Sequence, residues 1–308
     1  MTDIKFDTNT NKFFADINGQ RVESPNKQYL KTKISKLTQT ITANSAPQMV
    51  VDEMAEPLPA FSINERFDFT ASLVQMVASG IQPSLLITGE GGLGKTYTVT
   101  TTLQNAGLFD KLQALGDAEG DFNGADCGMQ MYRTVKGFST AKGLYRMLFE
   151  NHDSIVVFDD CDSVLKDPVA VNILKGALDS SDERWISWNS SKLDDDLPRS
   201  FKFTGGVIFI SNLAMGRIDQ AIRSRSMCVD LSMTDSEKLE RMGVIALSDS
   251  FMPGVADEYK KDAMDLIMAN AAYAANITMR TLISIVKIRM AGSNWTKLAT
   301  YTLINSAR

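Results

Sequence analysis

The residues best suited to chemistry in this sequence form segment 89–96, Gly-Glu-Gly-Gly-Leu-Gly-Lys-Thr, which matches the pattern GxxxxGK[ST]. Glycines let such a loop wrap with its backbone N–H groups pointing inward, where they bind phosphate oxygens. The lysine neutralises the β- and γ-phosphates of a nucleotide, and the threonine hydroxyl can bind Mg²⁺. The sequence therefore predicts a nucleoside triphosphate site. Its binding residues are Gly89, Glu90, Gly91, Gly92, Leu93, Gly94, Lys95 and Thr96.

The sequence on both sides of this loop supports the interpretation. An apolar run at 84–88 precedes it, and a segment ending at the helix-stop signal Asn105-Ala106-Gly107 follows it, so a strand, a loop and a helix are predicted in the required order. Segment 96–102 is rich in threonine, a poor helix former, and we expect packing against a sheet to override its propensity. The alternative is a glycine-rich turn with a surface lysine.

A second group of candidate residues follows the apolar run at 155–158. Asp159, Asp160, Cys161 and Asp162 come directly after this run, as expected where a buried strand delivers carboxylates to a phosphate site. We predict that Asp159 binds Mg²⁺, directly or through water, because an uncompensated acid at the end of a buried strand is costly. We predict that Asp160 orients the attacking water. Asp162 could share either role, but a loop or helix cap is the favoured interpretation.

These candidates require elements that place them together. Short apolar runs alternate with amphipathic stretches beyond residue 60, which is typical of a parallel sheet with crossover helices. The fold class predicted is therefore α/β, a parallel sheet with helices on both faces, followed by a small all-α lid. The strand runs are 84–88, 129–135, 155–158 and 207–210, and the lid helices are 236–247, 257–275, 279–290 and 295–304.

The first 48 residues differ from the rest in charge. They hold seven Lys or Arg against four Asp or Glu, whereas the whole chain holds 32 against 37, a net charge of -5. The turn signal Asn18-Gly19 predicts a β-hairpin, and the apolar spacing at 29–41 predicts a helix. A stretch rich in proline and acids then predicts a linker. The predicted domains are a small N-terminal module at 1–48, a linker at 49–60, an α/β domain at 61–232 and a helical lid at 233–308.

Composition limits the compartment and the class of partner. The mildly acidic chain excludes a uniformly basic surface for nucleic acid, but it permits a local basic patch. Cys127, Cys161 and Cys228 are odd in number and far apart, so neither a disulfide framework nor a zinc site is expected, and a reducing cytoplasm fits best. No window approaches the roughly 18 apolar residues needed to span a bilayer, so we expect no membrane partner.

With the loop and the acidic strand end in this order, segment 61–308 resembles the AAA+ class of P-loop ATPases. Asn212, which follows the strand run at 207–210, looks like the sensor-1 residue that helps to position water in that class. Asp160 stands where that class usually has Glu. Because Asp is one methylene shorter, the reach of this carboxylate and the rate of hydrolysis depart from what the resemblance implies.

Three arginines complete the resemblance. Segment 218–225 looks like the arginine-finger segment, and Arg225 is favoured over Arg223 as the finger. Arg280 opens a lid helix and looks like the sensor-2 arginine, which reaches the γ-phosphate from the lid. The alternative for each arginine is a solvated helix end or a surface ion pair.

The resemblance implies an enzyme that hydrolyses ATP with Mg²⁺, self-associates into a hexameric ring and remodels a macromolecular partner. A short N-terminal module on a compact chain is similar to ATPases encoded by tailed bacteriophages, which would place the protein in the host cytoplasm. The catalytic residues implied are Asp160, Asn212, Arg223, Arg225 and Arg280.

The partner stays open between nucleic acid and protein. The excess positive charge of residues 1–48 favours nucleic acid. Phe138, where related ring translocases often place a pore aromatic, favours protein, as does the acidic tip at 194–196 of a hairpin predicted for 184–203. In that hairpin we expect Trp185 and Trp188 to serve packing. Two alternative functions are an ATP-gated DNA-binding or replication accessory protein and a nucleotide-dependent scaffold with weak hydrolysis.

Overall fold

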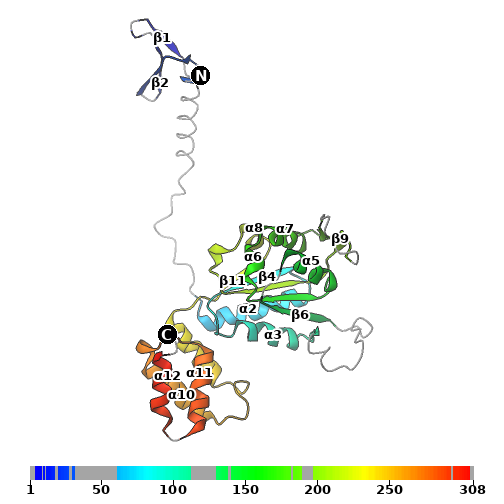
Figure 1. The fold of residues 1–308 in the computed structure, drawn as a ribbon, viewed down its shortest axis with the longest axis vertical. Coiled ribbons are helices and arrows are strands. Elements are labelled where there is room, and N and C mark those ends of the chain that lie inside the picture. Colours follow the sequence, from blue (N-terminus) through cyan, green and yellow to red (C-terminus); the bar gives the residue numbers. More distant parts are fainter. Residues whose placement is uncertain are drawn as a thin grey trace. The chain divides into compact units, whose positions relative to one another are not determined.

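The computed structural model describes residues 4–8, 10, 12–17, 20–27, 30–31, 61–111, 130–137, 140–181, 183–188, 197–292 and 294–305. The chain divides into two compact units, Met1–Ala60 and Phe61–Arg308 (Figure 1). Several predicted features lie outside the described residues. They are the Asn18-Gly19 turn, most of the helix at 29–41, the linker at 49–60, Cys127, Phe138 and the hairpin tip at 194–196.

The first unit contains a three-stranded antiparallel sheet in the order β1-β2-β3. Strands β2 and β3 form the pair predicted for the hairpin, with Phe14 opposite Glu23. The rings of Phe6 and Phe13 lie 4.8 Å apart, and Arg21 stacks on Phe14. Aromatic and cation–π contacts of this kind stabilise a small sheet that has little other core. The strands are β1 (Lys5–Asp7), β2 (Lys12–Ile17) and β3 (Gln20–Ser24).

The second unit is built on a six-stranded sheet in the order β11-β4-β10-β7-β6-β5, and all its paired strands are parallel. Four of its strands coincide with the predicted apolar runs. The two edge strands, β5 and β11, were not predicted, because β5 has only two residues and most of β11 is exposed, so neither forms a buried apolar run. The strands are β4 (Ser84–Thr88), β5 (Phe109–Asp110), β6 (Met131–Lys136), β7 (Ile155–Asp159), β10 (Val207–Ser211) and β11 (Met227–Asp230).

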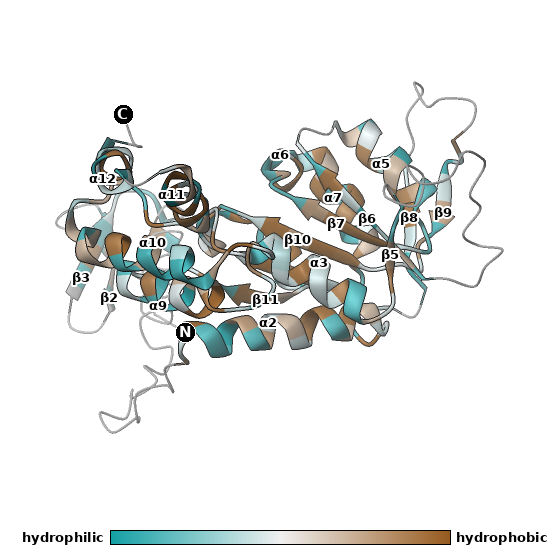
Figure 2. Ribbon diagram, turned by 90° about the horizontal axis from the view of Figure 1, so that it is seen from below, coloured by the Kyte–Doolittle hydropathy of each residue, from teal (hydrophilic) through white to brown (hydrophobic). Residues whose placement is uncertain are grey.

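Helices cover both faces of this sheet (Figure 2). Alternate residues of a buried strand point to opposite faces, so Leu85 and Ile87 of β4 pack with α2 and α3, whereas Leu86 packs with α5, α6 and α7. The apolar strands therefore supply two hydrophobic clusters at once. The helices on one face are α2 (Ile63–Ala78) and α3 (Lys95–Asn105), and those on the other are α5 (Ala141–Glu150), α6 (Asp162–Lys166) and α7 (Pro168–Ala177).

Helix α3 forms although its sequence, KTYTVTTTLQN, is rich in threonine. Val99 and Leu103 are fully buried against the sheet. The hydroxyl groups of Thr100 and Thr102 donate to the carbonyl oxygens of Thr96 and Thr98, four residues earlier. Burial of the apolar side chains thus outweighs the weak propensity of the β-branched residues, as predicted.

The C-terminal part of the second unit is a helical lid with its own hydrophobic cluster. Its helices match the predicted ones except that α10 ends at Ala269, six residues before the predicted end. The side chain of Asn270 caps it by donating to the carbonyl of Leu266, and a short 3₁₀ turn, η3 (Ala271–Tyr273), follows. The lid helices are α9 (Asp235–Ala246), α10 (Asp257–Ala269), α11 (Met279–Ala291) and α12 (Trp295–Asn305).

The predicted hairpin ahead of β10 is present as the antiparallel pair β8 (Trp185–Ser187) and β9 (Ser200–Lys202). Trp188 packs edge-on against Tyr145, with ring centroids 5.4 Å apart. Trp185 is 54% exposed, so the prediction that it serves packing was wrong. Among the residues that the structure describes, no helix combines the length and the apolar character needed to cross a membrane.

Candidate functional site

The segment 89–96 forms the connection between β4 and α3, at the carboxyl end of the central strands. Gly94 has a φ of 96°, a left-handed conformation that L side chains rarely adopt, and it begins α3. Gly89 has a φ of 138°, and a Cβ atom there would lie 2.8 Å from the backbone carbon of Leu231. Glycine is therefore required at both positions for the loop to take this path.

Lys95 is almost fully buried inside this loop. Its Nζ atom donates to the carbonyl oxygens of Gly89 at 2.6 Å and Glu90 at 2.7 Å, and to Asn212 Oδ1 at 3.0 Å. Burial lowers the pKa of Lys95, and the negative charges of Asp160 and Asp159 partly oppose this effect. The ammonium group therefore lies among the carbonyl oxygens of the loop, next to the acids at the carboxyl end of β7.

Asp159, the last residue of β7, is also buried beside the loop. Its Oδ1 accepts a hydrogen bond from Thr96 Oγ1 at 2.9 Å, and its Oδ2 lies 3.3 Å from Lys136 Nζ. Hydroxyl and carboxylate oxygens are ligands that Mg²⁺ prefers, so these residues fit a magnesium ion. In the described part of the chain, no group of three or more His, Cys, Asp or Glu is placed to hold a metal ion.

Asp160 and Asn212 form the third part of the site. Asp160 has a φ of 56°, and its carboxylate accepts from Asn212 Nδ2 at 2.6 Å. Asn212 therefore bridges Lys95 and Asp160, with its carbonyl facing the ammonium group and its amide facing the carboxylate. A flipped amide would lose both interactions, so the charges define its orientation. An exposed carboxylate held in left-handed backbone conformation beside a buried lysine is typical of a functional position.

A cavity of about 220 Å³ lies among these groups. The loop, Asp159, Asp160 and Asn212 line one side, and Arg280 at the start of α11 lines the other. A neighbouring cavity of about 380 Å³ is mainly apolar and shares Gly94, Tyr97, Met279 and Ile283 with the first. The two together have the polar and apolar halves that a nucleotide needs, one for phosphates and one for a base.

The lid contacts the loop directly. The backbone N–H of Met279 donates to the carbonyl of Gly92 at 2.9 Å. Lys238 of α9 forms an ion pair with Glu90 at 2.7 Å. The loop is therefore linked to two helices of the lid.

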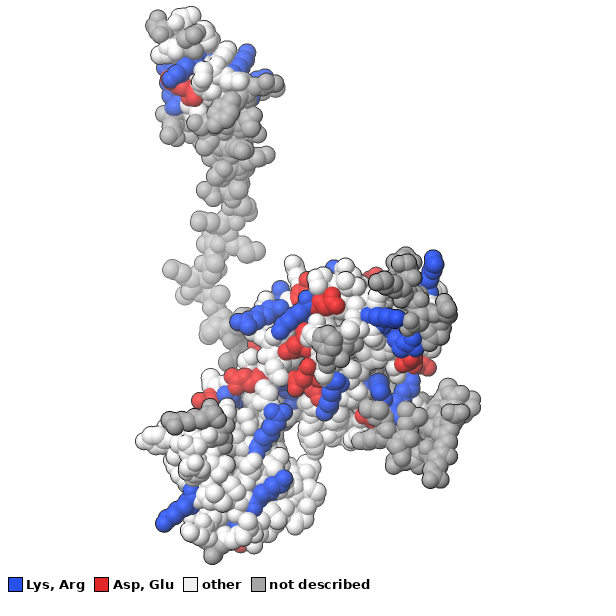
Figure 3. Space-filling view, viewed as in Figure 1, with Lys and Arg blue, Asp and Glu red and all other residues white. Residues whose placement is uncertain are grey.

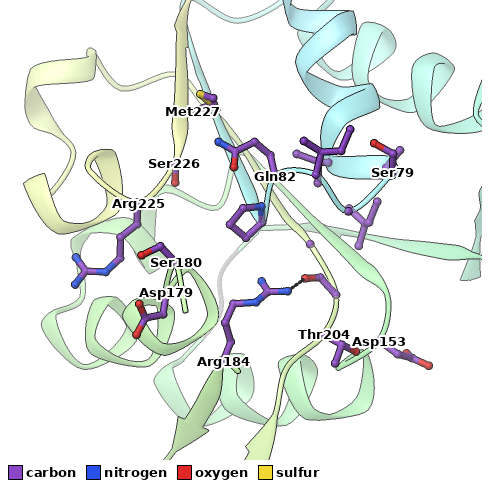
Figure 4. Close-up of a pocket in the computed structure, with 18 of the residues that line it drawn as sticks. Ser79, Gln82, Asp153, Asp179, Ser180, Arg184, Thr204, Arg225, Ser226 and Met227 are labelled. Carbon is purple, nitrogen blue, oxygen red and sulfur yellow. Dashed lines mark hydrogen bonds between the residues drawn. The ribbon is translucent and has the colours of Figure 1, made fainter. Parts of the chain in front are cut away.

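The remaining candidates lie at the opposite end of the sheet. Arg223 ends α8 (Gln220–Arg223), and Arg225 lies between α8 and β11, whose amino end pairs with the amino end of β4. Arg223 is half-buried, and its Nε donates to the carbonyl of Ile218 at 3.0 Å. Arg225 is exposed and lines a cleft of about 740 Å³ together with Arg184 (Figure 4). The structure thus places neither arginine in the cavity that holds Lys95.

Sequence reasoning missed two charged residues of the site and left one acid undecided. Lys136 ends β6, next to β7, and its position could have been inferred only from the strand order. Lys238 lies far along the chain, where no motif marks it.

Asp162 accepts a hydrogen bond from Ser211 Oγ at 2.6 Å and so links α6 to the end of β10, which is a structural role. Burial, with the charge of Asp159, raises the pKa of the Cys161 thiol to about 11, so it is no nucleophile at neutral pH.

The fold and the site together define the class of protein. A parallel sheet covered by helices, a GxxxxGKT loop after β4, acids at the end of β7 and a C-terminal helical lid give this chain an α/β fold of the AAA+ type, as the resemblance implied and as the predicted fold class stated. The sequence matches no protein-family model. It is 30% identical over 257 residues to a 36.7 kDa protein encoded in the nrdC-mobD intergenic region of Enterobacteria phage T4, a match that covers 77% of this chain and 73% of the relative. The chain belongs to the family of that phage protein.

Three solved structures resemble the chain in fold at low sequence identity. The ORC1 protein of Aeropyrum pernix in complex with DNA is 14% identical, with a TM-score of 0.42 over 80% of this chain and 66% of that one. Domain III of the replication initiation protein DnaA of Thermotoga maritima is 12% identical, with a TM-score of 0.42 over 81% and 100%. NtrX of Brucella abortus in complex with ADP is 13% identical, with a TM-score of 0.46 over 85% and 58%.

Proposed function

We propose that this protein is an ATPase that hydrolyses ATP with Mg²⁺, works as a ring and couples turnover to remodelling a macromolecular partner. One observation carries the proposal. Lys95, Thr96, Asp159, Asp160 and Asn212 come from the ends of three neighbouring strands and surround one cavity. This set contains the groups that phosphoryl transfer requires, namely a phosphate-binding lysine, a metal-binding hydroxyl and acid, and a water-orienting carboxylate.

The contacts around Lys95 indicate how the site responds to a nucleotide. Its Nζ now binds two loop carbonyls and Asn212, all within 3.0 Å. A triphosphate in the loop offers stronger, charged acceptors, so Lys95 would exchange these partners for phosphate oxygens. Asn212 would then be free to orient a water molecule together with Asp160. Thr96 and Asp159 would hold Mg²⁺, which supplies charge neutralisation on the phosphates.

The position of Arg225 supports assembly into a ring. It is exposed at the amino end of the sheet, whereas the cavity opens at the carboxyl end. An arginine there can reach a phosphate only in another subunit. Contacts between two different surfaces of identical chains are head-to-tail, and they close into rings when the rotation between neighbours allows it. We propose six subunits, with Arg280 acting within the same chain and Arg223 maintaining the backbone before the finger.

The contacts between lid and loop support coupling to mechanical work. Glu90 and Gly92 belong to the loop, and their partners Lys238 and Met279 belong to the lid. Loss of a phosphate changes what the loop binds, and these two contacts carry that change to α9 and α11. Movement of the lid against the α/β domain would displace neighbouring subunits and whatever they hold.

Phosphate release tests the proposal. Natural protein with Mg·ATP is compared with the variants Lys95→Ala and Asp160→Asn, and Lys166→Ala, an exposed lysine of α6, is the matched control. We expect the first two variants to lose turnover by about a hundredfold or more and the control to keep it. Turnover of the natural protein no higher than that of Lys95→Ala would contradict the enzymatic proposal.

A second candidate function is a nucleotide-dependent scaffold with weak hydrolysis. The short side chain of Asp160 and its 2.6 Å hydrogen bond to Asn212 favour it, because both hold the carboxylate away from a water molecule. In that case calorimetry would detect ATP binding that is lost in Lys95→Ala, while natural protein and Asp160→Asn would release phosphate at the same low rate.

A further inference from the structure

The last part of the lid has an unusual charge distribution. From Leu266 to Arg308 the sequence contains five Lys or Arg and no Asp or Glu. At the chain average of 37 acids in 308 residues, this stretch of 43 would hold about five. Helices α11 and α12 both lie in it. In Figure 3 the lid shows Lys and Arg side chains on a face with few acidic ones.

Most of this positive charge is available to a partner. Arg289 is neutralised by Asp262 and Glu258 of α10. Arg280, Lys287 and Lys297 are exposed and form no ion pair with any residue that the structure describes. A helix that retains unpaired cations and no acids along its exposed side attracts a polyanion.

Two of the charges belong to one stripe. Arg280, Ser284 and Lys287 are spaced four and three residues apart, so they lie on one side of α11. A groove of about 390 Å³ beside the start of this stripe is lined by Gly91 of the loop, by Arg280 and Ser284 and by Thr302 of α12. Its other lining residues are mostly hydroxyl and amide side chains, which donate hydrogen bonds to phosphate oxygens.

Two large side chains of α12 are also exposed. On α12, Tyr301 is 67% exposed and Leu298 is 56% exposed. They lie three residues apart, on one side of the helix. An aromatic ring in solvent beside unpaired cations offers a stacking surface for an unpaired base, because every base has a π-face. An acidic protein or an anionic membrane would bind the cations, but neither would stack on the Tyr301 ring as a base does.

We infer that the exposed face of α11 and α12 binds a single nucleic acid strand, with its phosphates on Lys287 and Lys297 and a base stacked on Tyr301. This surface is distinct from the nucleotide cavity. Strand binding does not depend on hydrolysis, so it would stand even if the ATPase proposal failed.

The test uses the full chain without nucleotide and a fluorescein-labelled oligothymidylate of about 30 nucleotides, longer than the ~4–16 nucleotides that such sites occupy. We expect binding that weakens steeply with salt. In the double variant Lys287→Gln/Lys297→Gln, affinity should fall by about tenfold, and the slope of log affinity against log salt should become shallower by about 1.4. Tyr301→Ala should weaken binding by about tenfold with an unchanged salt slope.

The matched control is Lys261→Gln/Lys166→Gln, which removes the same charge from exposed positions on α10 and α6. Affinity within twofold of natural protein is expected for this control, and circular dichroism verifies that every variant is folded. Absence of strand binding by natural protein would overturn the inference. So would equal weakening by both double variants, which would indicate a general charge effect. Binding to phosphatidylserine vesicles in preference to the strand would assign the surface to membranes instead.

Discussion

The two ends of the six-stranded sheet are built differently. At the carboxyl end, Lys95 and Asp159 are buried, and Asn212 links Lys95 to Asp160 through hydrogen bonds of 3.0 and 2.6 Å. At the amino end, Arg225 is exposed in a cleft of about 740 Å³, and among the residues that the structure describes its guanidinium donates only to the carbonyl of Ala221. One end is a connected network, and the other is an open surface that carries a charge.

This difference shows where each end finds its partners. A hydrogen-bonded network holds its groups in place before a ligand arrives, which is what binding and catalysis need. An exposed arginine beside a wide cleft is not positioned by its own chain, so a second surface has to position it. The proposed function therefore assigns a small ligand to the carboxyl end and another subunit to the amino end. The following experiments test that contrast.

The largest expected effect comes from two single variants, one that disables the carboxyl end and one that disables the amino end. Lys95→Ala and Arg225→Ala should each lower ATP turnover, by about a thousandfold for the arginine. Only Lys95→Ala should lose nucleotide binding in calorimetry, because Arg225 lies away from the cavity. An equal mixture of the two inactive variants should recover roughly a quarter of natural turnover, since one contact in four joins an intact loop to an intact arginine.

Arg217→Ala is the control for this mixture, since Arg217 is an exposed arginine of the 3₁₀ turn η2 (Met215–Arg217), just before α8. Turnover of this variant should match that of natural protein. If mixing restored no turnover while the variants still assembled, Arg225 would not act between subunits. If Arg225→Ala also lost nucleotide binding, the two ends would not be separate.

The carboxyl end was largely predictable from the sequence, and physical reasons explain why. The segment 89–96 is contiguous, and its glycines, lysine and threonine are each required by the path or the charge of a phosphate loop. Asp159 and Asp160 follow a run of apolar residues that only a buried strand explains. Local residue types were therefore sufficient to predict the strands β4, β7 and β10 and the acids beside them.

The remainder depends on contacts between distant segments. Lys136 lies beside Asp159 because β6 pairs with β7, and Lys238 lies beside Glu90 because α9 packs at the loop, 148 positions further along the chain. Neither pair has a local signature. The edge strand β11 could not be predicted either, because most of its residues are exposed and no apolar run marks it. These features depend on pairing between distant segments, which local sequence patterns do not encode.

A glycine-to-alanine substitution at each end of the sheet should change the free energy of unfolding by different amounts. A Cβ atom on Gly205, at the amino end, would lie 2.0 Å from the backbone oxygen of Ser154, which neither backbone segment can accommodate without shifting. Gly205→Ala should therefore lower the free energy of unfolding by about 3 kcal/mol or more. At Gly91 in the loop, the nearest atom to such a Cβ is Asn212 Oδ1 at 3.5 Å, an ordinary contact.

Gly91→Ala should therefore leave stability nearly unchanged and weaken ATP binding by about tenfold, because the methyl group enters the phosphate cavity. Urea unfolding measures the first quantity and calorimetry the second. Gly216→Ala, whose Cβ would contact nothing within 4 Å, is the control for both. Equal destabilisation by Gly91→Ala and Gly205→Ala would show that the loop glycine serves packing, like the glycine at the amino end.

The smallest expected effect concerns the link between lid and carboxyl end. Lys238 is 12% exposed and pairs with Glu90 and Asp235. Burial alone would lower its pKa, but the hydrogen bonds that Lys238 donates to Glu90 and Asp235 raise the pKa of Lys238 overall, so it is charged at neutral pH. Because Glu90 is 60% exposed, water screens the pair, and we expect a coupling energy of about 1 kcal/mol or less.

A double-mutant cycle of Lys238→Gln and Glu90→Gln, measured by urea unfolding, isolates that coupling from the bond to Asp235. At about 1 M salt, where the Debye length falls to about 3 Å, the coupling should shrink towards zero. Coupling that is absent even at low salt would leave the hydrogen bond from Met279 to Gly92 as the lid's contact with the loop.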